Sequence, residues 1–162
     1  MSNQRFERLP AILLKSVPLF VLRPIAQHIT VKIAKKHPHL FARLGKHTQT
    51  KYLIKPTNIP LVALLVPDQD KPTMQIFKNT QIPEYDAVIE GKFLFLLSML
   101  DGVHDGDALF FNRALTIGGD TEAVVCLRNA LDDVEGSVAS DIADVFGVAG
   151  RSVLSFLRQK EV

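Results

Sequence analysis

The chain has 162 residues, 47% of them hydrophobic and 22% charged, with a formal net charge of +2. A domain of this length buries about 70% of the surface that its unfolded chain would expose, so the composition predicts one globular domain with enough apolar side chains for a core and a cavity. The single cysteine excludes an internal disulfide and a thiolate metal site, which is typical of a reducing compartment such as the cytoplasm.

The N-terminal apolar run 11–22 is unlike a membrane anchor or a secretory signal. Lys15 and Pro18 interrupt it, Glu7 precedes it, and no small-residue cleavage site follows. No run in the chain reaches the roughly 18 uninterrupted apolar residues that a membrane-spanning helix needs. We therefore expect a cytoplasmic protein, with at most peripheral contact with the inner membrane.

Charge is distributed unevenly along the chain. Residues 1–55 contain eleven Lys or Arg and one acidic residue, Glu7, which gives this part a charge of +10. Residues 56–162 contain eight basic and sixteen acidic residues, a charge of −8. Two interpretations remain open: the basic part binds a separate anionic partner, or it packs on the acidic remainder of the chain.

The region 1–46 is predicted to form two or three short helices, because Pro10, Pro18 and Pro24 each precede an apolar stretch. From residue 24 to 36, isoleucines recur at every fourth position and lysines lie off this stripe, which indicates a basic amphipathic helix. Such a helix can lie in the headgroup region of an anionic bilayer. We therefore expect 1–46 to be an extension that docks on a membrane or a protein partner. The residues expected to dock are Ile25, Ile29, Lys32, Ile33, Lys35 and Lys36.

After a further short helix that ends near Gly45, the pattern changes to strands. Short runs rich in β-branched and aromatic residues, bounded by prolines, predict antiparallel strands at 52–55, 61–66, 73–78 and 85–90. A helix is predicted at 91–101 and a fifth strand at 113–118, which ends in a Gly-Gly turn. Asp120 is the expected N-cap of the next helix. Two more helices, at 140–147 and 150–159, complete the predicted elements.

The residues and their order resemble the sterol carrier protein 2 family. The similarity is densest in AVIEGKFLFLLSML, residues 87–100, and in FFNRALTIGGDTEAVVCLRNAL, residues 110–131. The fuller string DGDALFFNRALTIGGDTE, residues 105–122, together with the basic helical extension, more closely resembles the bacterial accessory factors of ubiquinone biosynthesis.

This resemblance implies an α+β fold, in which helices cover a five-stranded, mainly antiparallel sheet. It implies a basic helical extension at 1–46 and a sterol-carrier-like lipid-binding domain at 47–162. It further implies an apolar tunnel that holds a ubiquinone precursor or a phospholipid, and a non-catalytic role beside the enzymes of oxygen-independent ubiquinone biosynthesis.

The residues themselves predict a continuous apolar surface along a helix, an aromatic pair, a strand and a second helix. Each methylene group kept from water is worth about 0.8 kcal/mol, so a carrier of long lipids needs such a surface inside a cavity. From patterning alone, these side chains either line a cavity or fill a core. The ten residues expected to bind lipid are Phe93, Leu96, Leu97, Leu100, Phe110, Phe111, Leu115, Ile117, Leu127 and Leu131.

Patterns for catalysis and for metal binding fail one by one. The run DGVHDGD, residues 101–107, departs from a calcium loop because Val103 occupies the third ligand position. Cys126 lies within a predicted helix with no histidine nearby, which favours packing over nucleophilic chemistry. The histidines at 28, 37, 39 and 47 match no common metal spacing, and we expect them to be solvated or to face phosphate groups. We therefore expect neither an enzyme nor a bound cofactor or metal.

The alternative function is DNA binding by a C-terminal helix-turn-helix. The segment 140–158 has Ala143, Gly147 and Val153 at the small, turn and apolar positions of that motif, and Arg151 would begin the recognition helix. The many acidic residues at 132–144 argue against this function, since phosphate contacts supply most of the affinity for nucleic acid.

Overall fold

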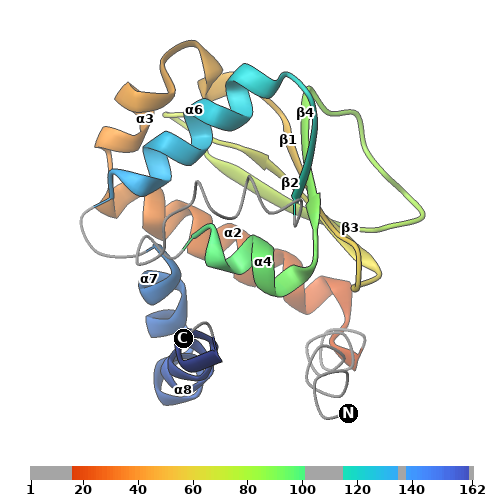
Figure 1. Ribbon diagram of the computed structural model, residues 1–162, viewed down its shortest axis with the longest axis vertical. Coiled ribbons are helices and arrows are strands. Elements are labelled where there is room, and N and C mark those ends of the chain that lie inside the picture. The colour runs from red at the N-terminus through yellow and green to blue at the C-terminus, as the bar shows by residue number, and fades with distance from the viewer. Residues whose placement is uncertain (1–15, 101–114, 135–137, 161–162) are drawn as a thin grey trace.

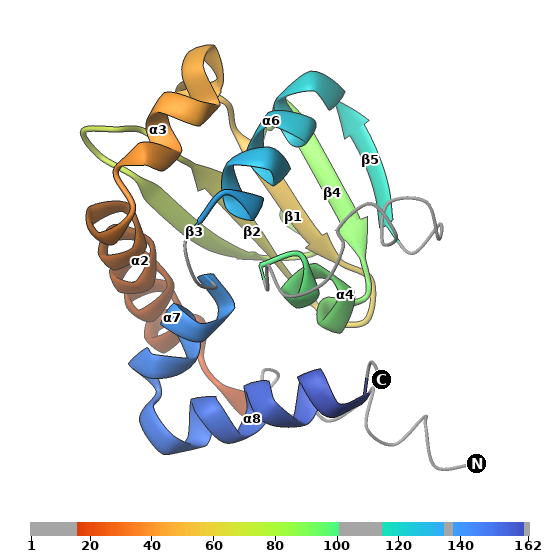
Figure 2. The ribbon, with the colours of Figure 1, turned by 60° about the vertical axis from the view of Figure 1, so that its left-hand side comes forward.

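Helices cover one face of a five-stranded sheet in the computed structural model, which describes residues 16–100, 115–134 and 138–160 (Figures 1 and 2). The strand order is β3-β2-β1-β4-β5. The predicted α+β class and the five-stranded, mainly antiparallel sheet are confirmed. The strands are β1 Tyr52–Pro56, β2 Leu61–Val66, β3 Thr73–Lys78, β4 Ala87–Gly91 and β5 Leu115–Gly119.

One pair among the first four strands is parallel, whereas the sequence predicted antiparallel strands for these four runs. β1 pairs with β4 in the parallel sense, with Leu53 opposite Val88, whereas the other three pairs are antiparallel. The chain leaves β3 at one edge and passes behind the sheet, on the face away from the helices, before it enters β4 beside β1 (Figure 1). Because of this crossover, β4 runs parallel to its neighbour β1, whereas a simple succession of hairpins makes all neighbouring strands antiparallel.

The two faces of the sheet carry separate apolar clusters, because side chains alternate along a strand. Leu53, Val62 and Leu64 form the cluster on the face away from the helices. Tyr52, Ile89 and other side chains face the helices and belong to the main core. The strand at 61–66 is apolar throughout because both of its faces are covered.

Within the described part of the N-terminal region, residues 16–46, a long helix is followed by a short one. Helix α2 runs from Leu19 to Lys36 and contains Pro24, which the sequence analysis placed at a helix start. Proline has no backbone N–H, so Pro24 cannot donate the helical hydrogen bond to the Phe20 carbonyl oxygen. This loss is tolerated because Phe20 lies in the first turn and the side chains of Pro24 and Phe20 are both exposed to water. The short helix α3, His39–Leu44, follows as predicted and leads into the 3-10 turn Gly45–Gln49.

The remaining described helices are α4 Phe93–Ser98, α6 Thr121–Asp132, α7 Val138–Val145 and α8 Gly147–Lys160. Helix α4 is shorter than predicted because Gly91 still belongs to β4. The predicted N-cap of α6 is confirmed: the Asp120 carboxylate accepts a hydrogen bond of 3.0 Å from the Ala123 backbone N–H. The preceding residue must be glycine, since Gly119 has φ +70° and a Cβ there would lie 2.2 Å from the Asp86 carbonyl oxygen.

Candidate functional site: an apolar cavity between the sheet and the helices

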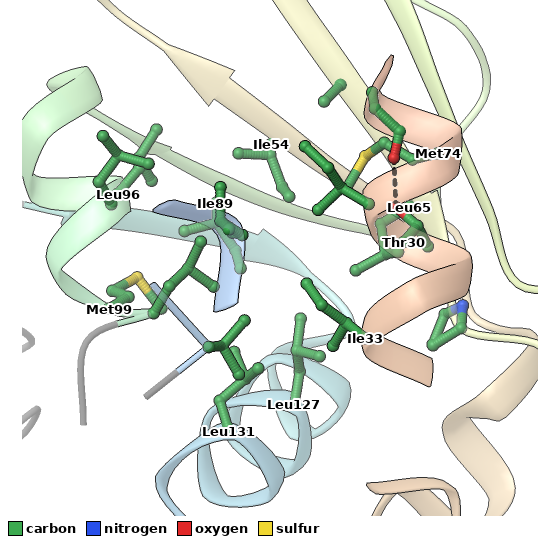
Figure 3. A pocket seen from close by; sticks show the side chains of 18 of the residues that line it. Thr30, Ile33, Ile54, Leu65, Met74, Ile89, Leu96, Met99, Leu127 and Leu131 are labelled. Carbon is green, nitrogen blue, oxygen red and sulfur yellow. Dashed lines mark hydrogen bonds between the residues drawn. The ribbon is translucent and has the colours of Figure 1, made fainter. Parts of the chain in front are cut away.

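A cavity of about 450 Å³ lies between the sheet and its layer of helices (Figure 3). Such a volume falls within the range of roughly 300–1,000 Å³ that is typical of small-molecule sites. Strands β1 to β4 form its floor, and helices α2, α3, α4, α6 and α7 contribute its other walls.

The floor consists of side chains that share one face of three neighbouring strands. Antiparallel registration places Ile54 of β1 opposite Ala63 of β2, and Leu65 of β2 opposite Met74 of β3. All four side chains line the cavity, and the small Ala63 leaves room beside its larger neighbours. Figure 3 shows Ile54, Leu65 and Met74 pointing into the same space.

Helix α2 forms the wall beside β3. Its stripe of Ile25, Ile29 and Ile33 lines the cavity. Other residues of α2 also line it. The sequence analysis assigned these isoleucines to docking on a membrane or partner, but their side chains face the sheet of the same chain. A four-residue apolar repeat indicates a buried face without showing which surface buries it.

The cavity is almost entirely apolar. Among the described residues that line it, none is charged and Thr30 carries the one polar side chain. The Thr30 hydroxyl already donates a hydrogen bond of 2.9 Å to the Ala26 carbonyl oxygen of its own helix. Because a buried polar group of a ligand would find few partners here, the cavity favours the hydrocarbon part of a molecule.

Six of the ten residues predicted to bind lipid line the cavity, namely Phe93, Leu96, Leu97, Leu100, Leu127 and Leu131. Leu115 and Ile117 belong to the main core but not to the cavity wall, because β5 lies at the far edge of the sheet. Phe110 and Phe111 lie outside the described residues. The aromatic pair predicted to bind lipid is thus not part of the described site.

Several lining residues escaped the sequence analysis. Ile54, Met74 and Ile89 come from strands whose alternation was recognised, but sequence does not reveal which face meets the helices. Ile142 of α7 was read as part of a DNA-binding motif, and the α2 isoleucines as a docking stripe. The apolar periodicity of these segments was the signal available in the sequence. Only the folded topology shows that their side chains line the same cavity.

Ion pairs connect the basic N-terminal part with the acidic remainder. Arg43 lies 2.7 Å from the Asp133 carboxylate and Lys46 lies 3.0 Å from the Glu122 carboxylate. Lys36 also forms an ion pair, which joins α2 to α7. Of the six residues predicted to dock, the isoleucines thus line the cavity and Lys36 is paired within the chain. Lys32 and Lys35 are exposed, and no ion pair is found for them within the described residues.

Two of the histidines that were expected to be solvated are buried. His37 is 5% exposed and its Nε2 lies 2.7 Å from the Asp141 carboxylate. His47 is also 5% exposed, with its ring between Asp120 and Glu122 at 3.7 and 3.6 Å. Both follow lysines in the sequence, which made them look like surface residues, but each faces a carboxylate from a distant part of the chain.

The described residues contain no group of three or more histidine, cysteine or acidic side chains arranged to hold a metal ion. The DGVHDGD run, 101–107, lies outside them. None of the described helices is long and apolar enough to cross a membrane. Cys126 is half-buried within α6, as predicted for a packing residue.

The proposed DNA-binding segment forms two helices, α7 and α8, on either side of a tight turn. Gly147 has φ +63°, and a Cβ on Gly150 would lie 2.2 Å from the Ala143 carbonyl oxygen, so the two helices pack closely. The guanidinium of Arg151, the expected first recognition residue, lies 2.7 Å from the Asp144 carboxylate. This ion pair neutralises the positive charge with which Arg151 would bind a DNA phosphate.

A mixed sheet and a helical layer that enclose an apolar cavity define a small domain of the lipid-carrier class. The sequence profile of the SCP-2 sterol transfer family matches residues 30–132, well over half of the chain. The chain therefore belongs to the SCP-2 sterol transfer family.

One solved structure shares the fold at low sequence identity, and a second is less similar. The protein described as "UbiJ-SCP2 Ubiquinone synthesis protein" is 13% identical, with a TM-score of 0.56, over 72% of this chain and 94% of that one. Sterol carrier protein 2 from Yarrowia lipolytica is 11% identical, with a TM-score of 0.45, over 72% of this chain and 93% of that one. No curated protein sequence matches the chain at a significant level.

Proposed function

We propose that the protein is a non-catalytic lipid-binding accessory factor that holds the hydrocarbon chain of a ubiquinone precursor or a phospholipid. The observation that carries this proposal is the cavity of about 450 Å³ with no charged side chain among its described lining residues. A water molecule takes about 30 Å³ of liquid volume and a methylene group is of similar size, so the cavity holds roughly fifteen such groups. That is one acyl chain, or part of a longer polyprenyl tail.

The assignment to ubiquinone biosynthesis, including its oxygen-independent branch, rests on two likenesses. The string at 105–122 resembles accessory factors of the UbiT type, and a solved structure of the same fold is described as a ubiquinone synthesis protein. The neighbours expected from this role are the enzymes that modify the quinone ring. An apolar cavity would hold the tail of their substrate and leave the polar ring outside it.

Lipid analysis of the purified protein tests the proposal directly. Native mass spectrometry and solvent extraction should find a bound lipid, and delipidated protein should bind isoprenoid quinones or phospholipids. Separate titrations with a quinone and with phospholipid vesicles decide between the two ligand classes. Protein that is lipid-free and binds neither class would contradict the proposal. Conversion of a quinone precursor by protein free of contaminating enzymes would contradict its non-catalytic part.

The proposal includes peripheral contact with an anionic bilayer through the outer face of α2. Lys32 and Lys35 are exposed on that face, and each basic residue near an anionic surface contributes about 1 kcal/mol. Flotation with anionic and neutral liposomes tests this contact. Replacement of both lysines by Glu should abolish the preference for anionic liposomes, whereas Lys78→Glu, an exposed residue on β3, should preserve it. Equal flotation of both variants would contradict the membrane contact.

A further inference from the structure

The wall formed by α7 is attached to the rest of the domain by a small set of contacts. Val138 and Ile142 line the cavity, and the Ala139 N–H donates a hydrogen bond of 3.0 Å to the Leu100 carbonyl oxygen. A further link is a polar cluster at the C-terminal end of α2. We name the cluster of Lys36, His37 and Asp141 the α2–α7 clasp.

The geometry of the clasp is specific. Both oxygens of the Asp141 carboxylate are engaged: Lys36 Nζ contacts one, and His37 Nε2 lies 2.7 Å from the other. His37 is buried and the Asp141 side chain is 13% exposed, whereas the Lys36 side chain is 57% exposed. Burial raises the pKa of Asp141, but the hydrogen bonds from Lys36 and His37 outweigh it and the pKa lies below its usual value. The carboxylate is therefore charged at neutral pH.

The other walls are tied more firmly to the domain. The floor is held by the backbone ladders of the sheet, and α6 packs into the main core through Val124 and Ala130, both fully buried. Helix α8 packs on α7 through the close approach of Gly150 to Ala143, so it can move together with α7. Displacement of α7 breaks the clasp and the hydrogen bond from the Ala139 N–H to the Leu100 carbonyl oxygen, and it removes Val138 and Ile142 from the main core.

The clasp also joins α7, which lies outside the family profile, to a helix that the profile covers only in part. The profile matches 30–132, so the first part of α2, with Ile25 and Ile29, and the whole of α7 lie outside the match. Both contribute cavity lining. This chain thus completes its cavity with additions from both ends of the matched segment and fastens α7 to α2 through Asp141.

From these contacts we infer that α7, with α8, is a movable wall of the cavity, and that the α2–α7 clasp controls how fast an apolar ligand enters and leaves. The inference rests on the proposed lipid-binding function, whose site it deepens. Opening breaks the Asp141 contacts, separates Ile142 from α2 and exposes the cavity along the gap. Closing restores the clasp and seals the hydrocarbon chain from water.

The test uses Asp141→Asn, which keeps the shape of the side chain and removes its charge. The matched control is Asp144→Asn on the same helix, where the exposed carboxylate pairs with Arg151 of α8. The full chain is loaded with parinaric acid, a fluorescent fatty acid, and its release to phosphatidylcholine vesicles is followed by stopped flow. Loss of a charged hydrogen-bonded contact should speed release about tenfold or more in Asp141→Asn and leave Asp144→Asn unchanged.

Amide hydrogen exchange of the peptide 138–145 gives a readout that needs no ligand. Exchange should rise in Asp141→Asn and remain at the wild-type rate in the control. If Asp141→Asn folds poorly, Lys36→Met tests the same cluster from its exposed side, with Lys78→Met, an exposed residue on β3, as control. Equal release and equal exchange in variant and control would overturn the inference. If the wild type binds no parinaric acid, the proposed function fails, and the exchange measurement still decides whether the clasp holds α7.

Discussion

The side-chain amide of Gln27 in α2 binds the backbone of β3 on both sides of Thr73. Gln27 Nε2 donates a hydrogen bond of 2.9 Å to the Pro72 carbonyl oxygen, and the Met74 N–H donates one of 2.9 Å to Gln27 Oε1. One turn earlier, Arg23 Nε donates to the Ile76 carbonyl oxygen at 3.0 Å. Side chains of α2 thus occupy backbone groups at the edge of the sheet, where a further strand would otherwise pair.

Replacement of Gln27 by Ala should loosen α2 and lower the free energy of unfolding by about 1–3 kcal/mol, because a part-buried N–H and a part-buried C=O lose their partners. Urea denaturation measures the change. Gln75→Ala, an exposed glutamine on β3, is the matched control and should remain within about 0.5 kcal/mol of the wild type. If both variants lose the same stability, the Gln27 contacts do not fasten α2 to the sheet.

Ala63→Phe should block ligand binding while the protein remains folded. Ala63 lines the cavity floor between larger side chains, so a phenyl ring there would occupy space that the hydrocarbon chain needs. Overpacking typically costs about 1–3 kcal/mol, which circular dichroism and thermal melting would register without loss of the fold. Affinity for parinaric acid should fall at least about tenfold, which corresponds to 1.4 kcal/mol.

The control for this substitution is Ala42→Phe, on the exposed side of α3. It adds the same ring outside the cavity and should bind parinaric acid as the wild type does. Unchanged affinity in Ala63→Phe would place the ligand elsewhere. The same pair of variants, titrated with acyl chains of increasing length, also shows how many carbons the remaining space accepts.

The contribution of Asp141 to stability should disappear in acid. Its pKa is lowered in the folded protein, because the hydrogen bonds from Lys36 and His37 outweigh the effect of burial. A lowered folded pKa gives stability that is present above the unfolded value of about 3.9 and is lost as the pH falls through the folded value. Urea unfolding from neutral pH to acid should therefore show a smaller pH-dependent loss in Asp141→Asn than in the wild type. Parallel curves for the two proteins would contradict this assignment.

Tyr52 should ionise far above the ordinary range of tyrosine. Burial raises its pKa to about 12, and its hydroxyl donates a hydrogen bond of 3.2 Å to the Ala123 carbonyl oxygen. The neutral phenol contributes about 3 kcal/mol to the free energy of unfolding below about pH 10, and this contribution is lost as the pH rises through about 12. Ultraviolet titration of the wild type should show the late step and Tyr52→Phe should lack it. A late step that survives in Tyr52→Phe would assign it to another group.

Local features of the sequence determined most of the secondary structure. Proline boundaries and alternating β-branched residues placed β1, β2 and β3 within one residue of their observed bounds, and Asp120 followed by an apolar helical stripe identified α6 and its cap. These signals are readable because capping, turn formation and the alternation of side chains depend on residues close together in the chain. The six cavity residues recognised in α4, in α6 and just after α4 belong to such stripes.

Tertiary structure decided which surfaces meet. The stripe Ile25, Ile29, Ile33 predicted a buried face equally well for a bilayer and for the sheet, and only its position beside β3 shows that it walls the cavity. The parallel pairing of β1 with β4 depends on a crossover that no local pattern records. His37 and Asp141 lie 104 residues apart, so their contact exists only after the chain has folded. Sequence patterns thus determine which side chains favour burial or an ion pair, and the topology of the sheet determines which residues they contact.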